Sequence, residues 1–172
     1  MRRIVGFMML FFCGVSVAVV RQQSDASIWL YNTPTPSAQL VISANGNVGI
    51  GTTAPSTKLD VAGTVSASAL VVNGSFSVGV NTKTTNTTLT TADSIVLVNN
   101  PADVDITLPL ALGSVGRYYT IKKTNANSYT VSIKLSGTDV LDGDTSAYVL
   151  TTPWQYAIVA SDGSGWYIVG GH

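Results

Sequence analysis

The chain has 172 residues, a formal net charge of zero and only 10% charged residues. This length accommodates one domain of ordinary size with small additional segments, and the charge balance excludes the basic surface that nucleic-acid binding requires. All nine acidic residues are aspartates. Together with abundant Thr, Ser, Val, Asn and Gly, the lack of Glu favours strands and turns over helices. An all-β fold is therefore predicted.

Residues 1–18 have the pattern of a secretory signal peptide. Arg2 and Arg3 precede an apolar run over 4–20, and Ser16 and Ala18 supply the small residues of a cleavage site. The alternative is an uncleaved membrane anchor, since the run is at the lower limit of length for a spanning helix. We expect export to the periplasm, the outer cell surface or the extracellular space, with membrane attachment only if the segment stays uncleaved.

The only cysteine, Cys13, lies within this predicted signal segment. A mature chain would therefore have no disulfide, no thiol nucleophile and no cysteine-bound metal. An exported chain without disulfides needs another source of stability, and oligomerisation is the obvious one.

Residues 19–44 form an N-terminal region with two expected strands, at 28–31 and 38–43. The Thr33–Pro36 stretch, written Thr-Pro-Thr-Pro, separates them because residues before proline avoid the helical region. The 28–31 strand packs at the base of the next segment or, alternatively, serves as a docking peptide for another surface protein. Asn45-Gly46 then predicts a hairpin turn.

Residues 45–87 are expected to form a fibre trunk. The stretch 45–67 reads NGNVGIGTTAPSTKLDVAGTVSA, with a glycine every few residues, short apolar triplets and no large side chain. One copy cannot build a core, so the segment needs partner chains, and glycine permits close backbone approach. The residues expected at the common axis are Val48, Gly49, Ile50, Leu59 and Val61. Further strands are expected at 66–72 and 75–80, with a Thr/Asn-rich joint over 81–91.

The block GNVGIGTT–P–KLDV–G resembles the trunks of bacteriophage tail fibres and tailspikes and of fibre-like trimeric adhesins, including mosaic adhesive trimers of predatory bacteria. The resemblance implies a homotrimer with an intertwined β trunk. The series ITLPLA, GRYYTIKKT, DG and WYIVGG is similar to C-terminal domains that cap phage fibres. The predicted signal peptide favours a cell-surface adhesin over a phage protein, because phage structural proteins assemble in the cytoplasm.

Residues 88–172 are expected to form a C-terminal tip with a β-sandwich or jelly-roll-like fold. Short alternating segments are separated by turns rich in Asn, Asp and Gly. Strands are expected at 94–98, 104–108, 117–123, 129–135, 147–150, 155–160 and 166–169. Trp166 is expected in the core or at a subunit contact.

The sequence does not predict an enzyme or a cofactor. His172 is the only histidine and the last residue, so a Ser/His/Asp arrangement lacks a well-held base. A small polysaccharide-degrading enzyme would need an exposed Asp pair. Asp139, Asp142 and Asp144 could offer oxygen ligands to Ca²⁺, but Asp-Gly is also a favourable turn. The turn is preferred, and no metal site is predicted.

Exposed aromatic rings stack on sugars, and neighbouring polar side chains bind hydroxyl groups. In an antiparallel domain, alternate loops lie at the same end of the domain. One end would then carry the loops 99–103, 124–128 and 151–154 with the C-terminal 170–172. The other end would carry the loops 109–116, 136–144 and 161–165. The first group is expected to face outward, although a short strand at 88–91 would reverse the assignment. Its candidate ligand-binding residues are Trp154, Asn125, Asn127, Asp103 and His172. Arg117, Lys122, Lys123 and Lys134 are interpreted as solvated surface, the two adjacent lysines pointing to opposite faces.

These features lead to the hypothesis of an exported homotrimeric adhesin whose tips bind a surface glycan or related cell-envelope polymer, with three weak sites acting together. The alternative is a purely structural phage-fibre or envelope-spike segment without a ligand of its own.

Overall fold

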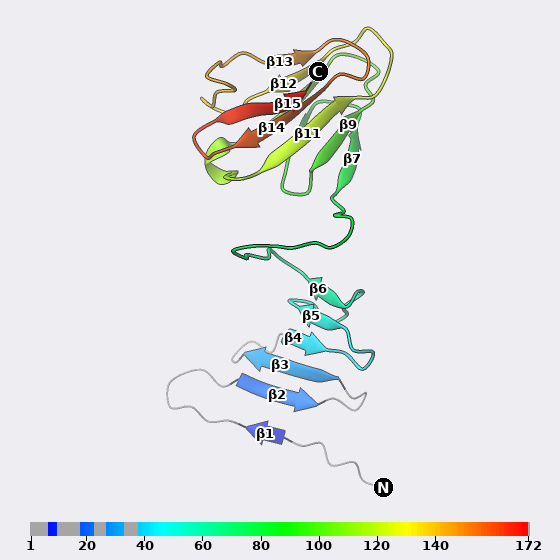
Figure 1. Cartoon of the computed structure of the whole chain (residues 1–172), viewed down its shortest axis with the longest axis vertical. Helices are drawn as coiled ribbons and strands as arrows, with labels where there is room; N and C mark the ends of the chain where they lie inside the picture. Colours follow the sequence, from blue (N-terminus) through cyan, green and yellow to red (C-terminus); the bar gives the residue numbers. More distant parts are fainter. Residues whose placement is uncertain (1–6, 10–17, 23–26, 33–37, 172) are drawn as a thin grey trace. The chain divides into compact units, whose positions relative to one another are not determined.

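A computed structural model describes residues 7–9, 18–22, 27–32 and 38–171 of the chain. Within these ranges it contains fifteen strands and one short 3-10 helix, which confirms the all-β prediction. The chain divides into two compact units, Met1–Val71 and Val72–His172 (Figure 1). Most of the predicted signal segment, the 33–36 break and His172 lie outside the described residues. No described helix has the length and apolarity needed to cross a membrane.

The N-terminal unit is a single six-stranded sheet in which neighbours in sequence are neighbours in space. Its strands are β1 (Phe7–Met9), β2 (Ala18–Gln22), β3 (Ile28–Asn32), β4 (Ala38–Ile42), β5 (Val48–Ile50) and β6 (Leu59–Val61). Neighbours up to β5 are antiparallel, and β6 runs parallel to β5. The strands predicted at 28–31 and 38–43 are confirmed, as is the Asn45-Gly46 turn, where Gly46 has a φ of 78°.

The segment between Val61 and Val80 does not form the strands expected at 66–72 and 75–80. Residues 62–79 contain no strand, so this prediction is wrong except at its last position, where β7 begins at Val80. Leu70, Val71 and Val72 are exposed, although valine has a high strand propensity. Propensity alone does not make a strand, because the backbone groups also need a neighbouring ladder.

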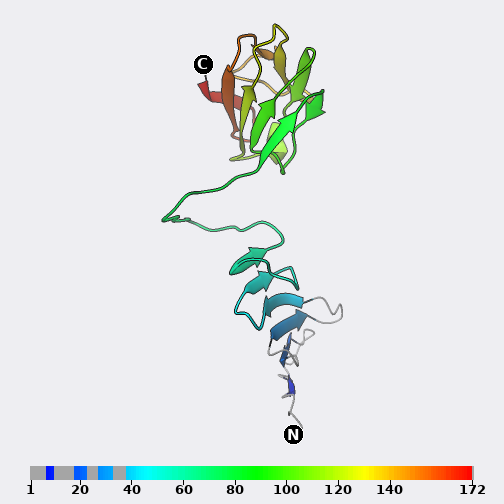
Figure 2. The ribbon, with the colours of Figure 1, turned by 90° about the vertical axis from the view of Figure 1, so that its right-hand side faces the viewer.

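The C-terminal unit contains two mixed sheets (Figures 1 and 2). The five-stranded sheet, in spatial order, is β15 (Trp166–Gly171), β14 (Tyr156–Ser161), β11 (Tyr118–Lys123), β9 (Ile95–Val98) and β7 (Val80–Lys83). The four-stranded sheet is β13 (Tyr148–Leu150), β12 (Val131–Lys134), β10 (Val104–Thr107) and β8 (Thr87–Thr88). The seven predicted tip strands are therefore present, with ends shifted by one or two residues.

From β7 to β12 the chain alternates between the two sheets. Successive strands reverse direction, so neighbours within one sheet run parallel: β9 pairs with both β7 and β11, and β10 pairs with both β8 and β12. The expectation of an antiparallel domain is thus corrected for these strands. The predicted grouping of the loops at two ends still holds, because it requires only that successive strands run in opposite directions. Residues 76–79 enter the unit beside the 109–117 loop, and the 99–103, 124–128 and 151–154 loops lie at the opposite end.

Both sheets contribute to one buried core. Val96, Val98 and Ile121 of the five-stranded sheet join Ile106 and Ile133 of the four-stranded sheet in a single cluster. Along β9, β10 and β11, buried residues alternate with more exposed ones. This is the period-two pattern expected for strands with one face against a core. Trp166 is fully buried, stacks on Tyr119 with ring centroids 5.6 Å apart, and donates its indole N–H to Pro109 O at 3.1 Å. Its predicted place in the core is confirmed.

The Thr/Asn-rich residues expected to form a joint belong instead to the C-terminal unit. They supply β7 and β8, so the expected boundary at 87/88 lies inside this unit, which begins at Val72. The Lys83 ammonium lies 2.9 Å from the Asp93 carboxylate and links β7 to the turn before β9. Burial alone would raise the pKa of Asp93, but Lys83 and the Thr90 N–H lower it below its ordinary value.

Candidate functional site

A buried lysine organises the loop end formed by residues 99–103, 124–130 and 151–155. Lys123 is 0% exposed, which corrects its interpretation as solvated surface. Its Nζ donates to both the main-chain and side-chain oxygens of Asn125 and Asn127. Burial lowers the pKa of Lys123, and these oxygens replace the water that the ammonium loses.

The predicted ligand-binding asparagines complete the same internal network. Asn125 Nδ2 donates to the Asn100 main-chain and side-chain oxygens, both at 3.0 Å, and Asn127 Nδ2 donates to Asn100 O at 2.6 Å. The Asp103 carboxylate is exposed but accepts bonds from the Thr130 N–H and hydroxyl at 2.7 and 3.1 Å. The structure thus brings Asn125 and Asn127 together as loop supports, with most of their hydrogen-bonding capacity already used.

Trp154 is the predicted site residue that remains available to a ligand. Its side chain is 54% exposed, and its φ is 66°. It occupies the third position of the 152–155 turn, in which the Gln155 N–H donates to Thr152 O at 3.3 Å. Glycine or asparagine is usual at a turn position with positive φ, and a bulky residue there is strained. Backbone strain at a residue whose side chain is exposed is typical of functional positions.

Lys122 and Tyr156 lie beside Trp154 and were not predicted as site residues. Lys122 Nζ donates to Trp154 O at 2.8 Å and lies 5.3 Å from the centre of the Tyr156 ring. The register pairs Lys122 with Tyr156 across β11 and β14, a contact that only strand pairing reveals. Lys122 thus joins the main chain of Trp154 to the ring of Tyr156, and these three residues are here called the platform. His172 lies outside the described residues.

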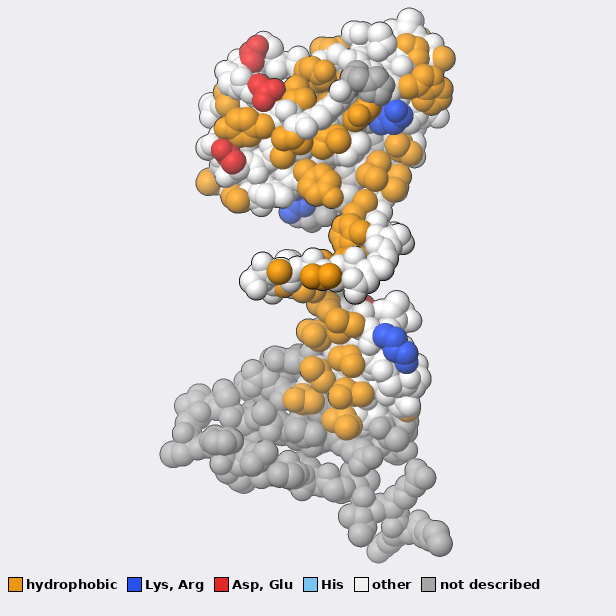
Figure 3. All heavy atoms as spheres, viewed as in Figure 1, with side chains coloured by type: hydrophobic (Ala, Val, Ile, Leu, Met, Phe, Trp, Pro, Cys, Tyr) orange, Lys and Arg blue, Asp and Glu red, His pale blue; other side chains and the backbone are white. Residues whose placement is uncertain are grey.

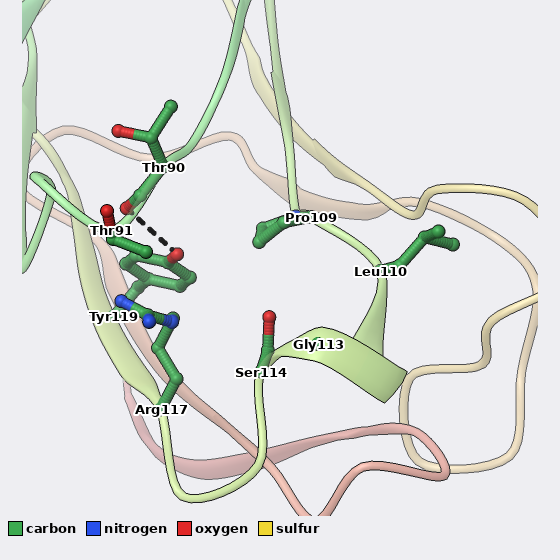
Figure 4. Close-up of a pocket in the computed structure, with 8 residues that line it drawn as sticks. All are labelled: Thr90, Thr91, Pro109, Leu110, Gly113, Ser114, Arg117 and Tyr119. Atoms are coloured by element: carbon green, nitrogen blue, oxygen red, sulfur yellow. Dashed lines mark hydrogen bonds between the residues drawn. The ribbon is translucent and has the colours of Figure 1, made fainter. Parts of the chain in front are cut away.

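A hollow of about 400 Å³ lies at the other end of the C-terminal unit (Figure 4). Three segments form it: the turn before β9, the loop after β10 and the start of β11. The lining residues are Thr90, Thr91, Pro109, Leu110, Gly113, Ser114, Arg117 and Tyr119. The Tyr119 hydroxyl donates to Thr90 O at 3.1 Å. Burial raises the pKa of Tyr119, and the positive charge of Arg117 opposes that rise. No local motif marks this hollow in the sequence.

In the N-terminal unit, four of the five predicted axis residues lie on one face of the sheet. Val48 pairs with Leu59, and Ile50 pairs with Val61. The register extends both pairs into rows of aliphatic residues across four strands, namely Ile28–Ile42–Val48–Leu59 and Leu30–Leu40–Ile50–Val61. Ile28, Ile42, Ile50 and Leu59 are exposed, and hydrophobic side chains gather on this unit in Figure 3. The other four row residues are half-buried, and no described strand or helix forms a second layer on this face.

Gly49 lies on the opposite face of the sheet from Val48 and Ile50. The expectation that all three residues share one axis-facing surface is therefore corrected for Gly49. It is buried, and a Cβ there would lie 2.6 Å from Thr52 O and 3.5 Å from Pro55 Cβ. The close approach that this glycine permits is therefore made by its own chain. The 51–58 loop folds back over this face, where Val41 is 1% exposed, and leaves only the aliphatic rows open.

The two sheets of the C-terminal unit differ in their outward faces. On the four-stranded sheet the outward positions are polar apart from Val149, and Lys134 Nζ lies 2.7 Å from the Asp105 carboxylate. On the five-stranded sheet they are mainly apolar or aromatic, namely Val80, Ile95, Leu97, Tyr118, Tyr156, Ile158, Ala160, Tyr167 and Val169. Hydrophobic side chains spread over the unit's visible face in Figure 3. Surface patches rich in apolar side chains are frequent at interaction sites.

The Asp139–Asp144 segment forms the turn preferred from the sequence. Asp142 and Gly143 both have positive φ, 52° and 84°, and Leu141 and Asp144 exchange backbone hydrogen bonds of 2.8 and 3.0 Å. The three carboxylates accept hydrogen bonds from backbone N–H groups: Asp139 from that of Ala111, Asp142 from that of Ile168 and Asp144 from that of Ser146. The Ser146 hydrogen bonds lower the pKa of Asp144. In the described part of the chain, no three acidic, His or Cys side chains converge as metal ligands.

The chain matches no protein-family model, and the comparison with curated proteins returns no similar sequence.

Proposed function

We propose that the chain is an exported, fibre-like homotrimeric adhesin with an intertwined β trunk and a β-sandwich tip that binds a glycan of a cell envelope. One observation carries the proposal: the N-terminal unit is a single-layer sheet with two uncovered aliphatic rows. A single sheet needs a second layer to bury its apolar face. Each Ile or Leu that moves from water to a buried site contributes about 1.5–3 kcal/mol, so covering these rows with further copies of the chain supplies the missing core.

The outward face of the five-stranded sheet supports the same assembly. Its only charged strand residue is Lys122, because Lys83 pairs with the buried Val98 on the inward face. Lys122 itself contacts Trp154 O and the Tyr156 ring. A nearly uncharged face can pack on a copy of itself without like-charge repulsion. Both units thus carry surfaces suited to association, and the number three follows from the resemblance of the trunk block to trimeric fibres.

The glycan-binding part of the proposal rests on Trp154. The Trp154 indole is half-exposed and offers a flat surface for the apolar face of a sugar ring. Lys122, which binds the Trp154 main chain, supplies a cation for the polar groups of the sugar. No catalytic step is assigned to this platform. Single contacts of this kind are weak, and three tips on one axis would strengthen binding through effective concentration.

The second candidate is a structural fibre or spike segment with no ligand of its own. The observation that favours it is that Asn125, Asn127 and Asp103 already use their polar atoms within the loop end. In that case the loops would need only to hold their shape.

The test is to measure the solution mass of the purified protein by light scattering and then to screen it on a glycan array beside Trp154→Ala. The proposal predicts a mass of three chains and glycan binding that the substitution abolishes. A stable monomer would contradict the fibre, and a trimer without glycan binding would leave the structural role. The mass of the mature N-terminus tests export, with cleavage expected after Ala18.

A further inference from the structure

The hollow beside Arg117 contains a hydroxyl that no side chain or main-chain group of the described residues binds. Ser114 is 4% exposed, and Figure 4 shows its hydroxyl pointing into the hollow. Its backbone is bonded, with the N–H donating to Ala111 O at 2.8 Å and the carbonyl accepting from the Arg117 N–H at 2.9 Å. Because the described residues contain no buried side-chain oxygen or nitrogen without a hydrogen-bond partner, this hydroxyl is reached by solvent from the hollow. A ligand that displaces that water must replace its hydrogen bond.

Arg117 supplies a positive charge at the same place, where its side chain also hydrogen-bonds Tyr119. The ion pairs of the described residues are Lys83–Asp93 and Lys134–Asp105, so the Arg117 guanidinium has no carboxylate partner there. The nearby Asp93 is already held by Lys83 and by the Thr90 N–H and hydroxyl at 2.9 and 3.1 Å. Figure 4 shows the guanidinium beside the Tyr119 ring, on the same side of the hollow as Thr91.

The remaining wall limits the size and character of a ligand. Pro109 and Leu110 are apolar and form the side opposite Arg117 (Figure 4). A volume of about 400 Å³ is at the lower end of the range for ligand sites, so it suits one small ring better than a chain of them. A guanidinium fork matches a planar carboxylate in a bidentate arrangement.

We propose that this hollow binds the carboxylate of an acidic sugar residue. Arg117 holds the two carboxylate oxygens, the Ser114 hydroxyl donates to the ligand, and the sugar ring packs against Pro109 and Leu110. The inference rests on the proposed function in taking a glycan as the ligand, but it concerns a site at the opposite end of the unit from Trp154. It assigns anionic polysaccharides to this chain as the preferred class of ligand.

The test titrates the full-length mature protein with sodium glucuronate, glucose and acetate, using ligand-observed NMR at low ionic strength. Glucuronate is expected to bind saturably at millimolar concentration. Glucose should bind at least about tenfold more weakly because it loses the charged hydrogen bonds, and acetate at least about tenfold more weakly because it lacks the ring that packs against Pro109 and Leu110. Equal binding of glucose would overturn the role of the carboxylate, and equal binding of acetate would overturn the role of the ring. Absence of saturable glucuronate binding would overturn the proposal.

Three variants locate the site. Arg117→Gln should weaken glucuronate binding at least about tenfold, and Ser114→Ala about threefold or more. Lys134→Gln, which removes a cation from the outward face of the other sheet, should leave glucuronate affinity within about twofold of the wild type.

Unchanged binding in both Arg117→Gln and Ser114→Ala would overturn the proposal. The serine variant removes one oxygen that has no protein partner, so folding is preserved. Trp154→Ala separates the two proposals, because it should abolish array binding at the platform and leave glucuronate binding intact.

Discussion

The Lys123 ammonium binds Asn125 and Asn127 of the 124–130 loop, and the amide groups of these asparagines bind Asn100 of the 99–103 loop. A lysine is almost never fully buried unless its charge is satisfied, and here oxygens of both asparagines surround it. The neighbouring Lys122 is on the outer face of the same strand and donates a hydrogen bond to Trp154 O. These adjacent residues therefore have the same chemistry and opposite environments.

Lys123→Met should lower the free energy of unfolding by about 2 kcal/mol, because it leaves buried oxygens without a donor. Lys122→Met should lower it by about 0.5 kcal/mol or less, since that side chain is partly exposed to water. Urea denaturation at one fixed protein concentration measures both. Equal effects of the two substitutions would contradict the buried role of Lys123.

Trp154 is the second residue whose environment is unusual, because of its φ of 66°. Trp154→Gly should be more stable to unfolding than Trp154→Ala by about 1 kcal/mol, because glycine has no Cβ to strain in this conformation. Both variants should lose glycan binding equally. Chemical denaturation of the pair gives the comparison, and an alanine variant as stable as the glycine variant would show that the turn is unstrained.

Asp162 provides a pH-dependent contribution to stability. Hydrogen bonds from the Ser164 N–H, the Ser164 hydroxyl and the Gly165 N–H lower its pKa from 3.8 to about 2. A carboxyl whose pKa is depressed by folding stabilises the native state above its unfolded pKa, and the contribution is lost as the pH falls towards the folded pKa. Stability should therefore decrease between about pH 4 and pH 2, and Asp162→Asn should show a shallower decrease. Denaturation curves across this range test the sign, and identical pH profiles would contradict it.

The aliphatic rows of β3 to β6 are the part of the N-terminal unit on which the proposed assembly depends. Register places four aliphatic residues side by side in each row, whereas the 51–58 loop covers the other face. A sheet covered on one face only by a loop has little core of its own.

Ile50→Asp should dissociate the assembly, because it places a charge on the face that must become dry. The matched control is Ala54→Asp, which adds the same charge to the exposed loop and should leave the mass unchanged. Light scattering at a fixed protein concentration measures both variants. Retention of the wild-type mass by Ile50→Asp would exclude this face as the subunit contact.

The whole molecule presents apolar surface in both units, and the outward faces of the two C-terminal sheets allow an internally controlled test. Thr120 is at the centre of the five-stranded face, paired with Ile95 and Ile158. Ser132 is at the centre of the four-stranded face, paired with Asp105 and Val149. The two positions carry similar small side chains and differ in their surroundings.

Thr120→Lys should weaken association, because the added charge would be buried between apolar surfaces. Ser132→Lys should leave association unchanged, because its face already carries Lys134 and Asp105 in contact with solvent. Sedimentation velocity over a concentration series measures the effect. Equal behaviour of the two variants would show that the five-stranded face stays open to solvent in the assembly.

The sequence by itself determined the β class, the tip strands to within a residue or two and the turns at Asn45-Gly46 and Asp142-Gly143. These features depend on local chemistry, namely alternation of side chains along a strand and glycine at positive φ. The tertiary structure decided which strands pair, and strand pairing is non-local. It alone made 80–83 a strand and left 70–72 without strand structure. It also buried Lys123, bound Asn125 and Asn127 to Lys123 and Asn100, and brought Ser114 and Arg117 to one hollow. Side-chain alternation is set within a few residues, whereas the partner across a sheet is chosen by the burial of the whole unit.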